Sequence, residues 1–292
     1  MQQREERDFY LFVSPWILGI IFLFGGPIIA SFGLSLTSWT GVSIESLQFV
    51  GLQNYQDIFS DELFRTSLIN TIYYAVGSVS LGIVVSLFIA ILLNQNVPGT
   101  GIFRTLFYLP SITAGVAMAV VWIWVFNPRV GLFNFLLGLV GVAGPAWLKD
   151  TNWALPALIL MSLWQTGSYI IILLAGLQGV PQSLYEAAEI DGANRWNQFR
   201  HVTLPMISPA LFLVVVIATV NSFQIFVNIR VMTQGGPGTS TMVYVYYLYQ
   251  NTFSYLRMGY GSALAWVLFV VIGILTWLQF KASNSLVHYE GG

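Results

Sequence analysis

Residues 66–103 read TSLINTIYYAVGSVSLGIVVSLFIAILLNQNVPGTGIF, a stretch with no Asp, Glu, Lys or Arg between Arg65 and Arg104. A helix crosses a hydrocarbon core of about 30 Å with about 20 largely apolar residues. The run from residue 68 to residue 93 meets that requirement, and the polar, turn-forming residues 94–99 separate it from a further apolar run. This stretch therefore predicts two membrane-spanning helices joined by a short turn.

The same test finds about six apolar runs along the chain. They cover residues 9–32, 68–93, 102–126, 153–175, 204–228 and 258–280. The first run is longer than the 7–15 apolar residues of a secretory signal, and no small-x-small cleavage site follows it, so we expect a retained helix. The sequence thus predicts an all-α integral membrane protein in which residues 1–292 form a single transmembrane domain.

Composition agrees with a bilayer location and excludes several functions. Only 8% of residues are charged, against about 25% in soluble domains. A net charge of −1 gives no basic face for nucleic acid. The chain has no Cys, and His201 and His288 are its only imidazoles, so we expect no catalytic residue and no metal site. Neither Lys149 nor Lys281 stands in a phosphate-binding Gly-x-x-x-x-Gly-Lys-Ser/Thr loop, so we expect no enzyme activity and no bound cofactor.

The distribution of Lys and Arg between the two sides of the membrane says little about the orientation of the helices. Six spans place both termini on one side of the membrane. That side, with the even-numbered loops, holds six of the eleven Lys and Arg residues, and the other side holds five. Because Lys and Arg accumulate in cytoplasmic loops, the count slightly favours cytoplasmic termini.

The loop of residues 177–203, between the fourth and fifth runs, has an unusual pattern of turn signals. Pro181 suits the first turn of a helix, and Gly192 suits the left-handed residue that ends one. A second short helix is expected from about Ala193 to His201. The residues alone are equally compatible with an amphipathic hairpin that lies in the membrane interface.

This loop resembles the EAA loop of binding-protein-dependent ABC importer permeases. The resemblance rests on Glu186-Ala187-Ala188, on Gly192 four residues later, and on Phe199, Val202 and Leu204-Pro205. Further motifs occur in the order found in carbohydrate-type permeases, of the first-permease kind typified by maltose and glycerol-phosphate importers. They are Phe49–Tyr55, Asn70-Thr71, Arg104–Pro110, Phe126-Asn127-Pro128, Gly131–Asn134, Ala175–Gln178, Met232–Pro237 and Gly259–Ala263. The resemblance therefore covers nearly the whole chain.

The resemblance implies a function and a set of partners. In that family the EAA loop is a cytoplasmic coupling helix that docks on an ATP-hydrolysing subunit, with ATP and Mg bound there and not by the permease. The matching residues here are Glu186, Ala187, Ala188, Asp191, Gly192 and Ala193, with Glu186 expected to pair with a partner arginine. The resemblance also implies a bacterial inner-membrane location, cytoplasmic termini, a second homologous permease, two ATPase subunits and an extracytoplasmic solute-binding protein that delivers a sugar.

Polar side chains within the spans indicate where a solute pathway could lie. Their transfer into lipid is unfavourable in free energy unless they face a bundle interior or a water-filled cavity. The fifth run is the richest, and spacings of three and four residues place 221, 224, 225 and 228 on one face of a continuous helix. The candidates are Asn221, Ser222, Gln224, Ile225 and Asn228, with Trp164, Gln165 and Tyr169 from the fourth run. The alternative is that these amides bond helices to one another.

Two positions depart from the family pattern beside these candidates. Many relatives have an acid where Val227 stands and Tyr where Arg230 stands, and the residues do not say what the change means. Prolines also occur in or near the runs, at Pro110, Pro156 and Pro209, where a missing amide can kink a helix.

An ion-coupled secondary transporter of small polar solutes is the main alternative function. Proton coupling usually needs a carboxylate within the membrane, and no Asp or Glu lies in any of the six runs. A membrane-embedded enzyme would need an intramembrane His, Cys or acidic pair, which the runs also lack. Which sugar or polyol is carried, and whether the ATPase pair is one protein or two, are not encoded in any motif.

Overall fold

The computed structural model of the chain describes residues 2–95 and 98–286, so His288 lies outside the described residues. The described residues are nearly all helical and contain no β-strand, only one isolated bridge between Thr37 and Phe49. The helices fall into two compact units, Met1–Glu62 with Leu248–Val271, and Leu63–Tyr247 with Ile272–Gly292. The single domain expected from the sequence stays a prediction.

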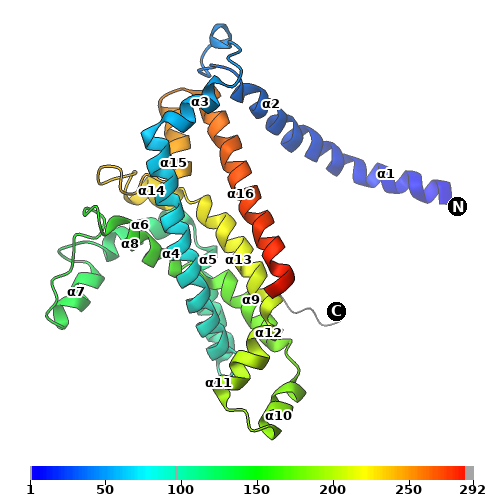
Figure 1. Cartoon of the computed structure of the whole chain (residues 1–292), viewed down its shortest axis with the longest axis vertical. Helices are drawn as coiled ribbons and strands as arrows, with labels where there is room; N and C mark the ends of the chain where they lie inside the picture. The colour runs from blue at the N-terminus through cyan, green and yellow to red at the C-terminus, as the bar shows by residue number, and fades with distance from the viewer. Residues whose placement is uncertain (1, 96–97, 287–292) are drawn as a thin grey trace. The chain divides into compact units, whose positions relative to one another are not determined.

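The first unit holds the N-terminal helices and the start of the last helix (Figure 1). Its elements are α1 (Gln2–Gly19), a π-helical turn (Ile20–Gly25), α2 (Gly26–Ser35), a 3₁₀ turn (Ile44–Ser46), α3 (Gln53–Ser60), a second π-helical turn (Gln250–Ser254) and the first part of α16 (Met258–Leu286). The rings of Phe32 and Trp266 pack edge to face with their centroids 5.1 Å apart, and Trp266 Nε1 donates a hydrogen bond to Ser31 Oγ at 3.2 Å. Asn54 donates to the carbonyls of Ser35 and Thr37 at 2.8 Å each. These contacts tie α2, α3 and α16 together.

The first apolar helix runs from Phe9 to Ser35 and presents its apolar side chains outward. None of its most apolar stretch is buried, although its mean hydropathy is 2.2. The π-helical turn at residues 20–25 ends two residues before Pro27, whose missing amide and bulky ring disturb the preceding turn. An apolar surface of this extent needs lipid or another protein against it.

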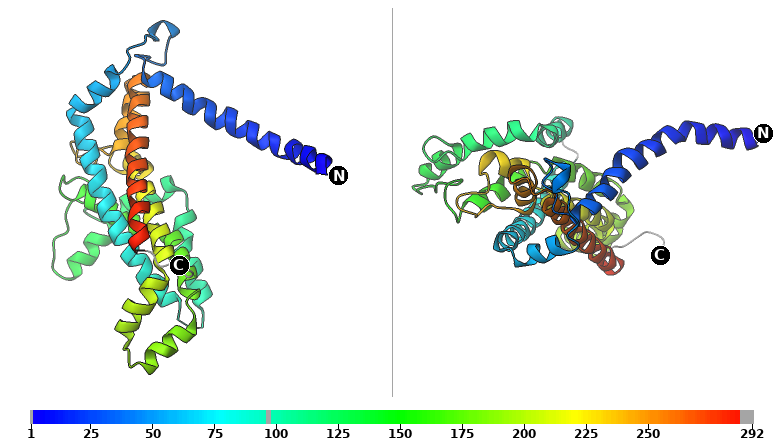
Figure 2. Two further views of the ribbon diagram at one scale, coloured as in Figure 1. Left: turned by 45° about the vertical axis from the view of Figure 1, so that its right-hand side comes forward. Right: turned by 90° about the horizontal axis from the view of Figure 1, so that it is seen from above.

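The second unit holds the remaining helices (Figures 1 and 2). They are α4 (Glu62–Leu93), α5 (Thr100–Ile112), α6 (Gly115–Val125), α7 (Leu132–Leu139), α8 (Ala154–Leu163), α9 (Gly167–Gln178), α10 (Gln182–Ile190), α11 (Arg195–Gln198), a π-helical turn (Phe199–Thr203), α12 (Leu204–Met206), α13 (Ser208–Phe223), α14 (Val227–Met232) and α15 (Tyr244–Tyr249). Its core packs α4, α9 and α13 together through Ala90, Leu93, Ile170, Leu173, Leu174, Leu177, Ile207 and Val214.

Within the described residues, four helices are long and apolar enough to cross a membrane: Phe9–Ser35, Glu62–Leu93, Ser208–Met232 and Met258–Ser283. Two helix pairs meet the same test jointly but are sharply bent, α5 with α6 by 100° and α8 with α9 by 45°. Counting each pair as one span gives up to six by length and composition. The expected all-α fold is therefore confirmed, but the third and fourth spans are broken rather than continuous.

The prolines act differently from the sequence prediction. Pro110 lies two residues before the end of α5, and Thr113 then adopts extended backbone, so this proline does accompany a bend. Pro156 and Pro209 stand in the first turns of α8 and α13, where no intrahelical amide is needed. These two prolines therefore stand where helices begin and not within a continuous helix, and the helical backbone is interrupted at Ile207, just before Pro209.

Candidate functional site

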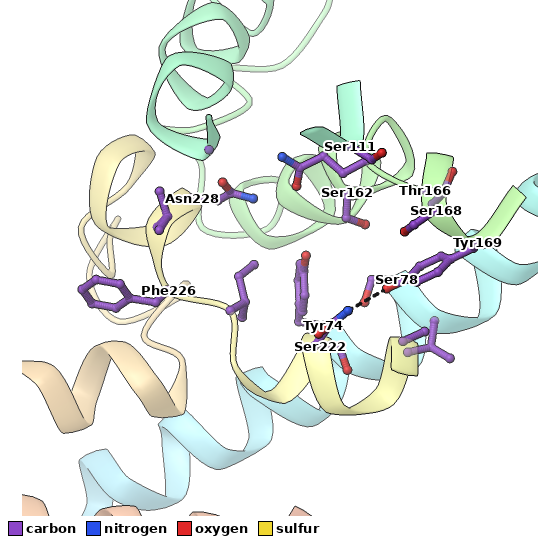
Figure 3. Close-up of a pocket in the computed structure, with 17 residues that line it drawn as sticks. Tyr74, Ser78, Ser111, Ser162, Thr166, Ser168, Tyr169, Ser222, Phe226 and Asn228 are labelled. Carbon is purple, nitrogen blue, oxygen red and sulfur yellow. Dashed lines mark hydrogen bonds between the residues drawn. The ribbon is translucent and has the colours of Figure 1, made fainter. Parts of the chain in front are cut away.

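A cavity of about 400 Å³ opens where three helices of the second unit are interrupted (Figure 3). The interruptions are the α5–α6 bend, the α8–α9 bend and residues 224–226 between α13 and α14. The cavity is lined by Tyr74, Ser78, Val79, Ser111, Gly115, Ser162, Gln165, Thr166, Ser168, Tyr169, Ala218, Asn221, Ser222, Ile225, Phe226, Val227 and Asn228. Irregular backbone at membrane depth is tolerated where it lines a cavity, and transporters place solute sites at such broken helices.

The lining of this cavity mixes apolar side chains with many hydroxyl and amide groups and carries no formal charge. Ser162 donates to the Ile159 carbonyl at 2.6 Å, Thr166 to Leu163 at 2.8 Å, and Ser222 to Thr219 at 2.8 Å. Since these hydroxyl protons are already used within their own helices, their oxygen lone pairs remain available as acceptors. Side-chain amides add both donors and acceptors. Such a lining suits a neutral, hydroxyl-rich solute.

The structure brings most of the predicted pathway residues together. The residues that line the cavity are Asn221, Ser222, Ile225, Asn228, Gln165 and Tyr169. Asn221 Nδ2 donates to the Tyr169 hydroxyl at 3.3 Å, which joins α13 to α9 across the cavity. This bond is the kind of helix-to-helix link that the alternative interpretation of these amides requires.

Two predicted pathway residues lie away from the cavity. The prediction of one continuous helical face is wrong because α13 ends at Phe223. Gln224 lies in the break that follows and is exposed, whereas Asn228 is buried on the next helix, α14. Trp164 is 54% exposed, and its ring packs edge to face against that of Trp122, with the ring centroids 6.3 Å apart. Neither side chain lines the cavity.

Sequence reasoning missed the contribution of the second span. Tyr74 and Ser78 lie one helical turn apart on α4, and both line the cavity. Their i, i+4 spacing could have nominated them, since it places two hydroxyls on one helical face. In Figure 3, Tyr74 and Ser222 lie on one side of the cavity, and Ser162, Thr166 and Ser168 lie on the other.

The EAA loop (residues 177–203) forms the helix–glycine–helix elbow that its turn signals predict. α10 begins directly after Pro181 and ends in a Schellman motif, in which Gly192 N donates to Glu189 O at 3.0 Å and Ala193 N to Ala188 O at 2.9 Å. Gly192 has φ of +79°, the left-handed conformation that glycine adopts without steric cost. Pro181 precedes the first helical residue instead of occupying it.

Side chains at the second bend hold the elbow in place. Asn194 caps α11 by accepting from Asn197 N at 2.9 Å. The Tyr185 hydroxyl lies 3.0 Å from Thr203 Oγ1, which links α10 to the π-helical turn of residues 199–203. The expected second helix therefore exists as α11 followed by this π-helical turn. In Figure 1 and in the left view of Figure 2 the elbow lies beyond the end of α4, away from α14.

The outer surface of the elbow is open and partly apolar. Glu186 and Ala187 are exposed, and so are Asp191 and Gly192, whereas Ala188 and Ala193 are half-buried. Sequence reasoning missed the two largest apolar groups at this surface, Ile190 at 87% exposed and Trp196 at 65% exposed. A small-residue surface with exposed isoleucine and tryptophan beside carboxylates has the composition of a protein-docking surface.

Comparison with known proteins identifies the class. Residues 82–285 match the family model described as binding-protein-dependent transport system inner membrane component. The chain is 42% identical, over 99% of its length and 94% of the relative's, to a probable ABC transporter permease protein, YesP, of Bacillus subtilis. It is 32% identical to the trehalose/maltose transport system permease protein MalF of Thermococcus litoralis, over 97% of this chain and 96% of that protein. The arabinooligosaccharides transport system permease protein AraP of Bacillus subtilis is 34% identical, over 94% of this chain and 88% of that protein.

Solved structures share the fold. A bacterial ABC transporter involved in the import of the acidic polysaccharide alginate superposes with a TM-score of 0.83 and 23% identity, over 98% of this chain and 99% of that one. A second structure shows the alginate ABC transporter in complex with an alginate pentasaccharide-bound periplasmic protein, again with a TM-score of 0.83. At this identity the likeness defines the fold.

The fold and the family match define a multi-pass permease subunit of an ATP-driven importer. This chain belongs to the family of inner membrane components of binding-protein-dependent transport systems. The resemblance seen in its motifs is thereby confirmed, and family membership supports ABC import over the ion-coupled alternative. A permease of this family is not itself the ATPase.

Proposed function

We propose that this permease moves a sugar or sugar-like solute through the cavity at the three helix breaks. The observation that carries the proposal is the lining, which combines hydroxyl oxygens, amides and a tyrosine without any charge. Sugars present hydroxyls that pair with such groups, and the aromatic face of Tyr169 can stack on a pyranose ring. The relatives named for trehalose and maltose and for arabinooligosaccharides support a sugar-class solute.

The EAA loop is the proposed docking site for an ATPase subunit, where ATP and Mg bind. Exposed Ile190 and Trp196 supply apolar contact area, and Glu186 can pair with a partner arginine. Since such an ATPase is cytoplasmic, the loop and both termini face the cytoplasm. The cavity then changes its access when the ATPases close and open.

A second homologous permease completes the proposed importer. The apolar helix from Phe9 to Ser35, none of whose most apolar stretch is buried, offers a surface for that partner and for lipid. A solute-binding protein would dock at the opposite membrane face, and the structure of the alginate transporter in complex with an alginate pentasaccharide-bound periplasmic protein supports such a partner. This chain contributes half of the gate, one ATPase docking site and part of the solute pathway.

Replacing Asn221 separates a pathway role from a bond between helices. We expect N221L to lower sugar uptake about threefold to tenfold in reconstituted vesicles, because one or two hydrogen bonds to the solute are lost. Y169F removes the 3.3 Å bond to Asn221 and keeps the amide, so it should transport nearly normally. Equal loss of uptake in both variants would show that the bond, and not the amide's access to solute, matters.

Neutralising Glu186 tests the docking surface. We expect E186Q to lower uptake and solute-stimulated ATP hydrolysis together by about tenfold, because a charge-assisted hydrogen bond to the ATPase disappears. Glu189 lies on the same helix and is also exposed, so E189Q is the matched control and should stay near wild type. Co-purification of the ATPase with each variant is the accompanying measurement. Wild-type coupling in E186Q would remove Glu186 from the interface.

A further inference from the structure

A second cavity, of about 590 Å³, lies at the end of the second unit that carries α10. Four helix ends meet around it. Asn94 follows the last residue of α4, Thr100 begins α5, Gln178 ends α9 and Gln182 begins α10. Its lining consists of Asn94, Gln95, Pro98, Thr100, Arg104, Leu177, Gln178, Val180, Gln182 and Tyr185, mostly polar and without a carboxylate.

Arg104 is the one charged residue of this lining, and its charge is uncompensated. Its Nε is buried and has no hydrogen-bond partner within the described part of the chain. No ion pair to this guanidinium exists among residues 2–95 and 98–286 either. A buried donor without a partner costs about 1–3 kcal/mol, so this half-buried guanidinium would be stabilised by an anion that accepts from Nε. The cavity beside Arg104 has room for one.

The position of the cavity indicates which anion it meets. Because the apolar helices α4, α5 and α9 begin or end around it, we place the cavity at the level of the membrane surface, where phospholipid phosphates are concentrated. Basic pockets between helix ends on the cytoplasmic side bind anionic headgroups. The amides of Gln95, Gln178 and Gln182 can donate to phosphate oxygens that the guanidinium leaves free.

We propose that this cavity binds the phosphate group of an anionic phospholipid, with Arg104 as its charged ligand. Free inorganic phosphate presents the same chemistry, and the two sources are separable by experiment. Gln182 and Tyr185 belong to α10, so a bound headgroup touches the first turns of the EAA loop. The site thereby links the lipid composition of the membrane to the part of the chain that is proposed to dock the ATPase.

Lipid retention by the complete, purified importer tests the site. After removal of native lipid, the complex is incubated with palmitoyl-oleoyl phosphatidylglycerol or the matching phosphatidylcholine, and bound lipid is counted by native mass spectrometry. We expect wild type to retain about fivefold more phosphatidylglycerol than phosphatidylcholine, from one arginine near the surface. R104Q should lose this preference, whereas R104K, which keeps the charge, should retain part of it. R129Q, which neutralises an exposed arginine outside the cavity, is the matched control and should behave as wild type.

Each outcome bears on the site. An unchanged preference in R104Q, or an equal loss in R129Q, overturns it. Complete displacement of phosphatidylglycerol by millimolar inorganic phosphate keeps the anion site but overturns the lipid as its ligand. If R104Q does not assemble, as judged by elution of the intact complex, R104K decides, and a lysine variant without any preference for phosphatidylglycerol overturns the proposal. Because binding is measured without transport, these results are independent of the solute that the importer carries.

Discussion

The variant G192V is expected to insert into the membrane at wild-type levels and yet to lose most of its ATP-driven uptake. Gly192 has φ of +79° at the bend of the EAA loop, where a side chain would find open space but the backbone conformation disfavours any L residue. The left-handed region costs an L residue about 1–2 kcal/mol, and more when the side chain is β-branched. Relief of that strain would open the Schellman motif and change how α10 is presented. We expect a drop in coupled uptake of about tenfold to thirtyfold.

The control for G192V is a residue that tolerates the same backbone conformation. Asparagine adopts left-handed φ more readily than other L residues, so G192N should keep most of the uptake. Uptake and ATP hydrolysis are measured on the same vesicles, with the amount of inserted permease determined by immunoblot. If G192V and G192N transport equally well, the left-handed turn is not needed for coupling.

The variant G167A is expected to disrupt the packing of the second unit beside the cavity. A Cβ at Gly167 would lie 2.5 Å from the backbone oxygen of Phe107 and 2.9 Å from the Cα of Tyr108, so α9 and α5 would have to separate. Overpacking of this kind costs about 1–3 kcal/mol. Because Thr166 and Ser168 line the cavity on either side of Gly167, the proposed solute pathway would widen or tilt. We expect thermal unfolding at lower temperature and uptake reduced by about fivefold or more.

The matched control for this substitution is G273A. Gly273 lies within α16, and a Cβ there would meet no atom within 4 Å. Alanine favours helix over glycine by about 1 kcal/mol, so G273A should be as stable as wild type or slightly more so. Wild-type unfolding temperature and uptake in G167A would show that α5 and α9 are not in fixed contact at this glycine.

The helices and the EAA loop were largely predictable because their signals are local. An apolar run of sufficient length has few stable alternatives to a spanning helix, so Glu62–Leu93 and Met258–Ser283 lie close to the expected residues. Pro181 and Gly192 mark the two ends of α10 through the backbone angles that they permit or require. The order of most helices along the chain could therefore be predicted from composition and from turn-forming residues.

The cavity proposed for the solute was only partly predictable because it depends on where helices break. Hydropathy reports how apolar a segment is and not the direction in which its helix runs. The 100° bend after Ile112 and the interruption after Phe223 could therefore not be predicted from it. Assigning positions 221, 224 and 228 to one face assumed an unbroken helix, and that assumption misplaced Gln224. Tyr74 was not predicted because a tyrosine within an apolar span is common and does not by itself indicate a site. Its place in the lining depends on polar residues that other helices bring close to it.

The uncharged lining of the cavity has a consequence for energetics across a polarised membrane. Moving one elementary charge through the membrane potential changes the free energy by about 2.3 kcal/mol per 100 mV. Because none of the residues that line the cavity is charged, their displacement in the proposed transport cycle carries no gating charge. If the proposed solute is a neutral sugar, its passage between these groups moves no net charge through the membrane potential, so this part of the cycle contributes no voltage-dependent work.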